Sequence, residues 1–430
     1  MPSPSPQASP PWSSMAGQTR TASAPGSAMP TASSTRLRRC PTASPRPKTR
    51  MAMADTSALP PFAPDRPMTL RLLPKVTLVP WGLTDPPGAR RAAALFDAAG
   101  QPIPEAECWR WWGEPITTLP DRDPAATPEL LPGRWLFGGL FYGHFGHLLC
   151  ESTARLWALD HAPGITGILF HPKLRFTHEN RMIRDHLALF QALGLADHHI
   201  RAPQTPVLVE EMVIPEQGFG IGDMAAGRPQ YRAFMRDRLS RAAPPEGPDH
   251  IYISRARLPS KRGSVLLETR IEALMEQAGY TIFHPQEHPL TVQLARYRAA
   301  RRIVALDGSA LHLAAMVLHP EAQVAILNRG PSQNIDDYLR QFRHFAGIDP
   351  ARIDAVRDYW FQAGRRVIKR ETHALLDLPA VAAALSAAGF LPPGTDWPAL
   401  TEADITAAIA DLETRAGHPM TRYPADPAHA

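Results

Sequence analysis

Cysteine is scarce in this chain. Its 430 residues include three cysteines, Cys40, Cys108 and Cys150, which lie far apart and form no Cys-x-x-Cys pair. An odd number of widely spaced cysteines argues against a disulfide framework and against a structural zinc site. Because this usage fits a reducing compartment best, we expect a cytoplasmic protein.

Long apolar runs are also missing. The chain has no run of 18 apolar residues, and its N-terminus lacks the apolar core of a secretory signal. We therefore expect no integral membrane segment, which leaves peripheral association with a membrane open.

Acidic residues are absent from the first fifty positions, which hold seven Lys and Arg. Residues 51–430 hold the other 39 basic side chains and all 41 acidic ones, so the +5 of the whole chain falls to about −2 there. A nucleic-acid surface needs basic residues clustered on the folded part, so we expect no nucleic-acid partner. Residues 1–67 are rich in Pro and Ser and poor in large apolar residues, which predicts a disordered tail.

Strand and helix patterns alternate in the second half of the chain. The pattern predicts short strands at 251–254, 281–283, 303–306 and 324–327, with a helix after each of the first three. Such alternation is typical of a parallel sheet with right-handed crossovers. Residues 68–243 form a first domain in this interpretation, and residues 331–430 form a mostly helical extension.

Polar residues follow each of the four predicted strands. They are Ser254 and Arg255, then His284, then Asp307 to Ser309, and finally Asn328 and Arg329. Ligands of open parallel sheets bind beyond the carboxyl ends of the strands, so we expect these side chains to meet at one edge. Ordinary polar loops are the alternative interpretation.

The small residues Gly308, Ser309 and Ala310 open a predicted helix. Small residues let a phosphate approach the free N–H groups at the positive end of a helix dipole. Arg255 and Arg262 would complete a diphosphate site with charged hydrogen bonds. A plain helix cap is the alternative. No Gly-x-Gly-x-x-Gly follows these strands and no Walker loop is present. Their absence argues against a dinucleotide-binding protein and against an ATP-hydrolysing enzyme.

His144, His147 and Glu151 form a second polar motif, in the first domain. On a helix, His147 and Glu151 would share a face, and a carboxylate beside an imidazole is typical of a general base. The three side chains could instead hold a metal ion, although no His-Glu-x-x-His pattern is present. A third interpretation is that they are packed and hydrogen-bonded, with Arg155 pairing with Glu151 one turn later.

The order and spacing of several motifs resemble glycosyltransferase family 61, a group that holds many capsular-polysaccharide biosynthesis proteins. The motifs are Tyr252-Ile-Ser-Arg255, Arg262, Glu268, Gly279-Tyr280, His284-Pro-Gln286, Gln293 and Asp307-Gly-Ser-Ala-Leu311, and upstream His147-x-x-x-Glu151-x-x-x-Arg155-Leu156. The resemblance covers about residues 130–330. This sequence departs from the family pattern at Asp307, where His is usual, and at His312 and Ala314, near the usual Thr and Asn.

The resemblance implies an α/β, GT-B-like fold, with two Rossmann-like domains whose parallel sheets face a cleft. Residues 68–243 would be the acceptor side and residues 249–330 the nucleotide-sugar side. It also implies an inverting transfer to a glycan or glycolipid acceptor, with no cofactor and no metal. The catalytic candidates are then His147, Glu151 and Asp307. The donor-binding candidates are Ser254, Arg255, Arg262, His284, Gly308, Ser309, Ala310 and His312.

Two other function classes stay open at this point. One is a metal-dependent hydrolase that uses His144, His147 and Glu151. The other is a protein that binds nucleotide sugars without turning them over. Bound metal would favour the first, and binding without turnover would favour the second.

Overall fold

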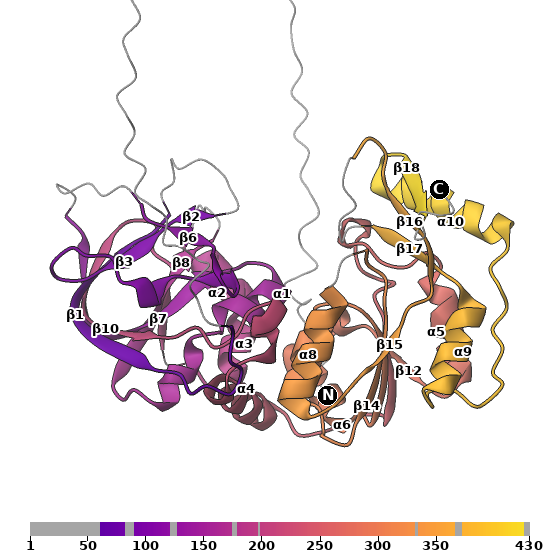
Figure 1. Ribbon diagram of the computed structural model, residues 1–430, viewed down its shortest axis with the longest axis horizontal. Helices are drawn as coiled ribbons and strands as arrows, with labels where there is room; N and C mark the ends of the chain where they lie inside the picture. The colour runs from indigo at the N-terminus through magenta and orange to yellow at the C-terminus, as the bar shows by residue number, and fades with distance from the viewer. Residues whose placement is uncertain are drawn as a thin grey trace, which may run out of the picture. The chain divides into compact units, whose positions relative to one another are not determined.

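A computed structural model describes residues 61–81, 90–120, 127–173, 179–196, 198–331, 334–365 and 372–424. Residues 61–430 group into one compact unit (Figure 1). Most of the predicted disordered tail, residues 1–60, lies outside the described residues. The last part of that tail packs against the folded chain, because Phe62 contacts the Trp112 ring at 5.5 Å and lies 4.4 Å from the Arg228 guanidinium.

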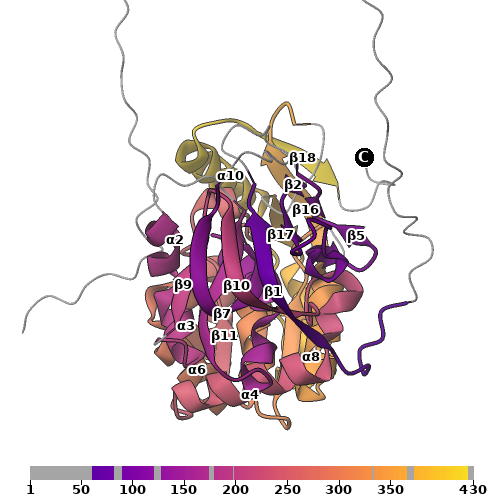
Figure 2. The ribbon, with the colours of Figure 1, turned by 90° about the vertical axis from the view of Figure 1, so that its left-hand side faces the viewer.

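The first half of the described chain is built around a six-stranded sheet with the order β3-β1-β10-β7-β8-β9 (Figure 2). Its strands are β1 (Leu70–Val79), β3 (Ala94–Phe96), β7 (Glu129–Phe141), β8 (Ile165–Pro172), β9 (His199–Arg201) and β10 (Val207–Pro215). Strands β10, β7, β8 and β9 are parallel, as predicted. Strand β1, however, runs antiparallel to β10 and β3, so this sheet is mixed and the prediction of a wholly parallel sheet is wrong here. The end of β1 buries every second residue, the pattern of a strand covered on one face, which antiparallel pairing allows.

Short helices and two small sheets surround this first sheet. The helices are η2 (Pro104–Ala106), α1 (Phe145–His147), η3 (Leu148–Ser152), η4 (Leu156–Asp160), α2 (Glu179–Asp185), α3 (Leu187–Ala192), η5 (Gly222–Ala226) and α4 (Pro229–Ala242). Strands β2 (Arg91–Ala92) and β6 (Thr117–Thr118) pair parallel, and β4 (Trp109–Trp111) and β5 (Glu114–Pro115) pair antiparallel. Among the described residues, no helix has both the length and the apolar character needed to cross a membrane.

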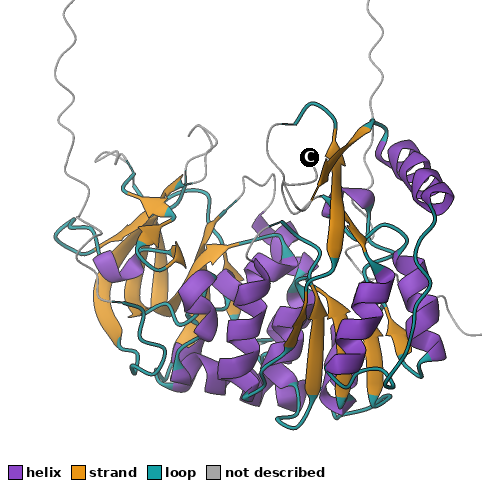
Figure 3. Cartoon of the chain, turned by 45° about the vertical axis from the view of Figure 1, so that its right-hand side comes forward, coloured by secondary structure: helices purple, strands orange, loops and turns teal. Residues whose placement is uncertain are grey.

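The second half contains a five-stranded, wholly parallel sheet with the order β12-β11-β13-β14-β15. Its strands are β11 (His250–Ile253), β12 (Thr281–Phe283), β13 (Arg302–Leu306), β14 (Gln323–Leu327) and β15 (Ala351–Ile353). Helices α5 (Glu268–Gln277), α6 (Leu290–Ala299), α7 (Ala310–Val317) and α8 (Asn334–Ala346) alternate with the strands along the chain, and η6 (Ser260–Arg262) and η7 (Pro285–Glu287) are short turns. Figure 3 shows helices, in purple, lying beside the strands, in orange. The four predicted strands are therefore confirmed, and β15 adds a fifth.

The prediction of a mostly helical extension over residues 331–430 is wrong in part. Helices α9 (Leu378–Ala387) and α10 (Glu402–Ala416) are present, but β16 (Val356–Gln362), β17 (His373–Leu376) and β18 (Met420–Pro424) form an antiparallel sheet. Val356 to Gln362 includes Val and three consecutive aromatic residues, which favour strands. This sheet lies beside the parallel one.

One hydrophobic cluster takes residues from both halves. It joins Phe170 and Tyr231 of the first half to Leu313 and Phe345 of the second. Tyr231, Leu313 and Phe345 come from α4, α7 and α8, and α7 is buried over all the positions from Leu311 to Val317. The two halves thus share a core, while the GT-B arrangement with its cleft stays a prediction.

Candidate active site

The first candidate site is built where β7 ends and the chain turns into α1 and η3. Because η3 continues the helical turn, His147 and Glu151 lie on one face, four residues apart. His147 Nδ1 lies 2.5 Å from Glu151 Oε2. The Glu151 side chain is 4% exposed and that of His147 is 37% exposed. The pair therefore presents its imidazole to solvent and hides its carboxylate.

The second oxygen of Glu151 is also occupied. The Tyr142 hydroxyl donates to Oε1 at 2.9 Å, and Arg110 Nε donates to the same atom at 3.2 Å. The Arg110 guanidinium also donates to the Tyr142 hydroxyl at 3.0 Å, and the Tyr142 ring stacks on His147 at 5.1 Å. These contacts lock the carboxylate and the imidazole in one orientation.

The surroundings keep Glu151 ionised. Burial by itself raises the pKa of this carboxyl, but the hydrogen bond from His147 and the charge of Arg110 outweigh it and lower the pKa below its usual value. A carboxylate can only accept hydrogen bonds, so Nδ1 of His147 carries the proton. In a neutral imidazole Nε2 is then the nitrogen with the lone pair, and that form can act as a general base.

Arg155 does not pair with Glu151, contrary to the sequence interpretation. Its buried guanidinium donates instead to the carbonyl oxygens of Glu105, Glu107 and Pro215. The spacing of four residues pairs side chains only within a continuous helix, and the helical turn ends at Ser152. Arg155 therefore ties the turn after η3 to the neighbouring strand and loop.

The second candidate site lies at the carboxyl ends of β11, β13 and β14. Arg255 leaves β11, and its guanidinium donates to the carbonyl oxygens of Arg262 at 3.2 Å and Gly263 at 3.1 Å. At Gly308, a Cβ atom would lie only 2.6 Å from Arg255 Nη1, so the glycine makes room for that guanidinium. Burial, and next the nearby Arg329 charge, lower the pKa of Arg255 to about 10.

Asp307 lies between positive charges. Its side chain is 1% exposed, and Oδ1 lies 2.9 Å from Arg329 Nε, with Arg255 as a second charge nearby. The buried carboxylate of Glu268 also lies near Arg255, so the two guanidinium groups face two carboxylates at this edge of the sheet. A guanidinium can bind two oxygens of a diphosphate at once, and Arg255 offers such a group here. Asp307 is enclosed, so the structure places it as a partner of Arg329 more readily than as a group that meets substrate.

Ser254 and His284 join the same strand edge through Glu272. The Ser254 hydroxyl donates to Glu272 Oε1 at 2.6 Å, and His284 Nε2 lies 3.3 Å from that oxygen. His284 is buried, which is the main reason that its pKa lies below the ordinary value. These two predicted donor residues thus both contact the Glu272 carboxylate.

The other predicted donor residues differ in their exposure. His312 is buried, with Nδ1 lying 2.7 Å from Gln341 Oε1 of α8, so it packs helix α7 against α8 rather than meeting a donor. Arg262 is exposed at the outer end of its loop, and Ser309 and Ala310 are half-buried at the start of α7. The structure therefore keeps Arg262, Ser309 and Ala310 within reach of a ligand and withdraws His312.

The two candidate sites meet where the backbone of Gly146 lies against the side chain of Ser309. A Cβ atom at Gly146 would lie 2.9 Å from the Ser309 Cβ, so the turn that carries His147 touches the start of α7. Gly146 thus brings His147 of the first half next to the turn that opens α7 in the second. Gly146 and Ser309 are far apart in sequence, and only the fold joins them.

Residues 145–325 match the family model described as Glycosyltransferase 61. The chain carries a glycosyltransferase family 61 domain. The matched stretch begins two residues before His147 and ends inside β14, so it holds both candidate sites except for Arg110, Tyr142 and Arg329. This supports glycosyltransferase activity in general. No curated protein matches the chain.

The metal-dependent hydrolase is not favoured. Within the described ranges, no group of three or more His, Cys, Asp or Glu side chains is placed to hold a metal ion. The His144 and His147 rings lie edge to face at 5.5 Å, and Glu151 is already bound to His147, Tyr142 and Arg110. The carboxylate that a metal would need therefore has other partners.

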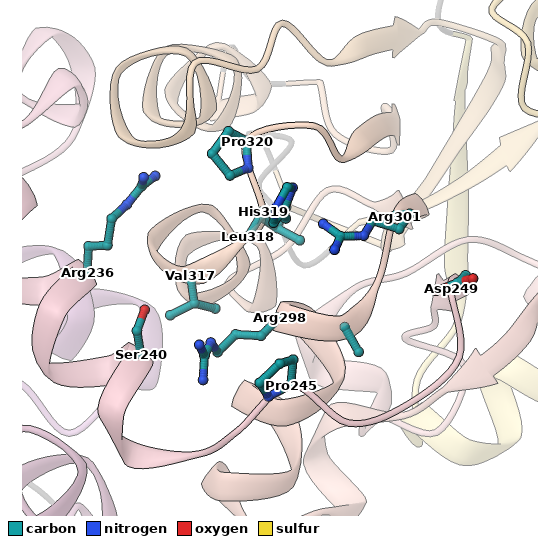
Figure 4. Close-up of a pocket in the computed structure, with 11 residues that line it drawn as sticks. Arg236, Ser240, Pro245, Asp249, Arg298, Arg301, Val317, Leu318, His319 and Pro320 are labelled. Carbon is teal, nitrogen blue, oxygen red and sulfur yellow. The ribbon is translucent and has the colours of Figure 1, made fainter.

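A basic groove between α4 and the ends of α6 and α7 has a structural explanation. Figure 4 shows Arg236, Arg298 and Arg301 around it, with Ser240 and Asp249. Arg236 donates to the carbonyl oxygen of Phe345, and Arg298 donates to that of Ala243. Both carbonyls stand at the carboxyl ends of helices, where cations stabilise the helix dipole. We therefore place the functional site at the edge that holds Arg255.

Sequence reasoning missed two groups that shape these sites, Arg110 and Tyr142, and gave Arg329 no particular role. Arg110 lies 41 residues from Glu151, so no local spacing reports their contact. Tyr142 follows a strand directly, which is a position worth inspecting for polar groups. Arg329 stood among the polar strand ends, and its role became visible only through its pairing with Asp307.

Proposed function

We propose that this protein transfers a sugar from a nucleotide-sugar donor to a hydroxyl group of a glycan acceptor, with inversion at the anomeric carbon. The observation that supports it best is the contact between Gly146 and Ser309, since it sets an oriented imidazole beside the strand edge that holds Arg255. A single-displacement transfer requires these two groups, one for the acceptor proton and one for the leaving diphosphate.

In this mechanism, Nε2 of His147 accepts the proton of the acceptor hydroxyl. The acceptor oxygen then bonds to the anomeric carbon as the bond from that carbon to the diphosphate oxygen breaks. Glu151 stabilises the imidazolium that forms, because its ionised carboxylate is bound to Nδ1. Arg255 and the first turn of α7 receive the negative charge that builds on the departing diphosphate.

The setting of the reaction is also part of the proposal. Basic residues take the place of a metal clamp, so the transfer needs no divalent ion. The acceptor is a growing cell-surface polysaccharide or its lipid-linked form, and the enzyme works in the cytoplasm, where nucleotide sugars are made. The transferred group is a hexose or a pentose. A binding protein without turnover is the second candidate, supported by the enclosure of Asp307.

Two substitutions separate the two halves of the site. His147→Ala should lower turnover about 10²–10⁴-fold and leave donor affinity intact, because the imidazole acts on the acceptor. Arg255→Ala should weaken donor binding roughly ten- to a hundredfold through loss of charged hydrogen bonds. Turnover and donor affinity would be measured by a coupled transfer assay and by calorimetry, across a panel of nucleotide sugars.

His319→Ala is the matched control, since His319 is a half-buried histidine of the basic groove. It should leave both parameters unchanged. Loss of donor affinity in the His147 variant together with normal affinity in the Arg255 variant would contradict the assignment of the two sites. Donor binding without turnover against any acceptor would favour the binding protein instead.

A further inference from the structure

The loop between Ser254 and Glu268 carries two of the proposed donor-binding residues, Arg255 and Arg262. It leaves β11, forms the turn η6, and returns at the first residue of α5. The Arg255 guanidinium does not stand alone, because the carbonyl oxygens of Arg262 and Gly263 accept its hydrogen bonds. The position of this guanidinium therefore depends on the position of residues 262 and 263.

The inner side of the loop is held by Glu268. Its buried carboxylate accepts from the Arg255 N–H at 2.7 Å and from the Ser264 hydroxyl at 2.7 Å. It also lies 3.1 Å from the Ser254 oxygen, whose proton is donated to Glu272. Leu267, next to it, has a φ of 57°, in the left-handed region that costs a leucine free energy. A strained residue persists only where its surroundings over-determine the backbone, so contacts on the outer side must also hold the loop.

Strand β17 supplies those outer contacts. The Ala374 N–H donates to the Ser264 carbonyl at 2.9 Å, and the Leu266 N–H donates to the Ala374 carbonyl at 2.8 Å. His373 Nε2 lies 3.0 Å from the Ser260 carbonyl oxygen. A carbonyl oxygen only accepts hydrogen bonds, so this nitrogen carries the proton and the imidazole donates.

The outer contacts are buried and backed by helix α10. His373 is 6% exposed, and burial is the main reason that its pKa falls to about 4, so the ring is neutral at physiological pH. Leu266 packs in one hydrophobic cluster with Leu375 of β17 and with Ile405 and Leu412 of α10. A buried hydrogen bond backed by packing holds a loop more firmly than one exposed to water.

We propose that the sheet of β16, β17 and β18 acts as a clamp on the donor loop, by which we mean the loop between Ser254 and Glu268. In this proposal His373 is a positioning residue for donor binding. The proposal rests on the proposed function, since it assigns the loop to the donor. His373 and Ala374 hold the backbone at Ser260 and Ser264, the residues between them hold the Arg255 guanidinium, and the guanidinium meets the diphosphate. Preorganisation of this kind raises affinity by reducing the ordering that a ligand must impose.

The test uses the full chain with His373→Ala and His373→Leu, the second of which fills the space without a donor. Each should raise the dissociation constant for the nucleotide sugar about two- to tenfold, the range for one lost neutral hydrogen bond, and leave kcat nearly unchanged. Each should also speed tryptic cleavage after Lys261 or Arg262, which is measured without any donor. His373→Gln keeps an N–H donor and should restore both values towards those of the wild type.

Tyr280→Phe is the matched control. It removes a buried hydrogen bond of the same half, from the Tyr280 hydroxyl to the Phe390 carbonyl at 2.8 Å, which does not involve the donor loop. It should lower Tm by about as much as the His373 variants do, and it should change neither the rate of tryptic cleavage nor the donor affinity. Equal effects of the control and of the His373 variants on donor affinity would overturn the clamp.

The remaining outcomes separate this proposal from the proposed function. If Arg255→Ala weakens donor binding while both His373 variants bind and cleave normally, the clamp is wrong and the donor site stands. If Arg255→Ala binds donor normally, the donor assignment fails and takes the clamp with it, even where the His373 variants are cleaved faster.

Discussion

At the scale of single residues, the pairing of His147 with Glu151 followed from their spacing and was confirmed by the structure. The partners of Glu151 did not follow, because Tyr142 and Arg110 reach it from a strand end and from a distant strand. Spacing predicts contacts within one turn of a helix, whereas contacts between elements depend on how those elements pack. For the same reason, the burial of His312 against Gln341 could not be read from its place beside Ser309.

Substitution of Glu151 tests the oriented base. Glu151→Gln should lower turnover about 10²–10⁴-fold and leave donor affinity unchanged, because the imidazolium loses its counter-charge. The double variant with His147→Ala should be little slower than the slower single variant, since both remove one unit. Additive losses, measured by steady-state kinetics, would show that the two residues act separately.

The same residue makes a prediction about stability and pH. The folded state lowers the pKa of Glu151 below the ordinary 4.5, so its contribution to stability is present above pH 4.5 and is lost as the pH falls through the folded value. The free energy of unfolding should therefore decline less steeply in Glu151→Gln than in the wild type between about pH 5 and pH 3. Denaturant titrations at a series of pH values measure this, and identical slopes would contradict it.

At the scale of elements, four strands of the parallel sheet in the second half were predictable because each is a short apolar run and a helical pattern follows each of the first three. The sheet of β16, β17 and β18 was not, since its three strands come from separate segments, with α9 and α10 between two of them. Antiparallel β1 was missed for a similar reason, because its direction depends on its partner β10, more than a hundred residues later. Local patterns identify elements, and long-range pairing decides their neighbours.

The turn between β13 and α7 gives a test at this scale. Gly308→Ala should weaken donor binding about tenfold or more, because the new Cβ would lie 2.6 Å from Arg255 Nη1 and displace the guanidinium. Calorimetry with the nucleotide sugar measures the change. Gly347→Ala is the control, since it adds backbone strain at a φ of 71° with no atom within 4 Å. It should lower Tm and leave donor affinity unchanged.

At the scale of the whole molecule, the shared core decides what the halves can do separately. Phe345 of α8 contacts the rings of Phe219 and Tyr231 at 5.2 and 6.1 Å, and Asp337 accepts from the Gly222 N–H at 2.9 Å. These contacts bury apolar surface and a charged hydrogen bond between segments that are far apart in the chain. The halves should therefore unfold together, although the sequence divides into two separate patterns of strands and helices.

A property of the intact enzyme follows from the Arg255 guanidinium at its strand edge. Transfer should proceed unchanged in the presence of EDTA, because Arg255 and the first turn of α7 supply the positive charge that other transferases take from a divalent ion. The measurement is initial rate after dialysis against chelator, with added Mn²⁺ as the comparison. Activity that disappears with EDTA and returns with Mn²⁺ would overturn the metal-free mechanism.

Because residue 146 is a glycine and has no side chain, it has a consequence for how this enzyme can change its substrate. Backbone meets side chain directly between Gly146 and Ser309, so main-chain geometry sets how closely the turn before His147 approaches the start of α7. Loops around the site can then vary in length and chemistry without altering that approach. Under the proposed function, new sugar preferences are open to such variation, while the spacing that a direct displacement needs stays constant.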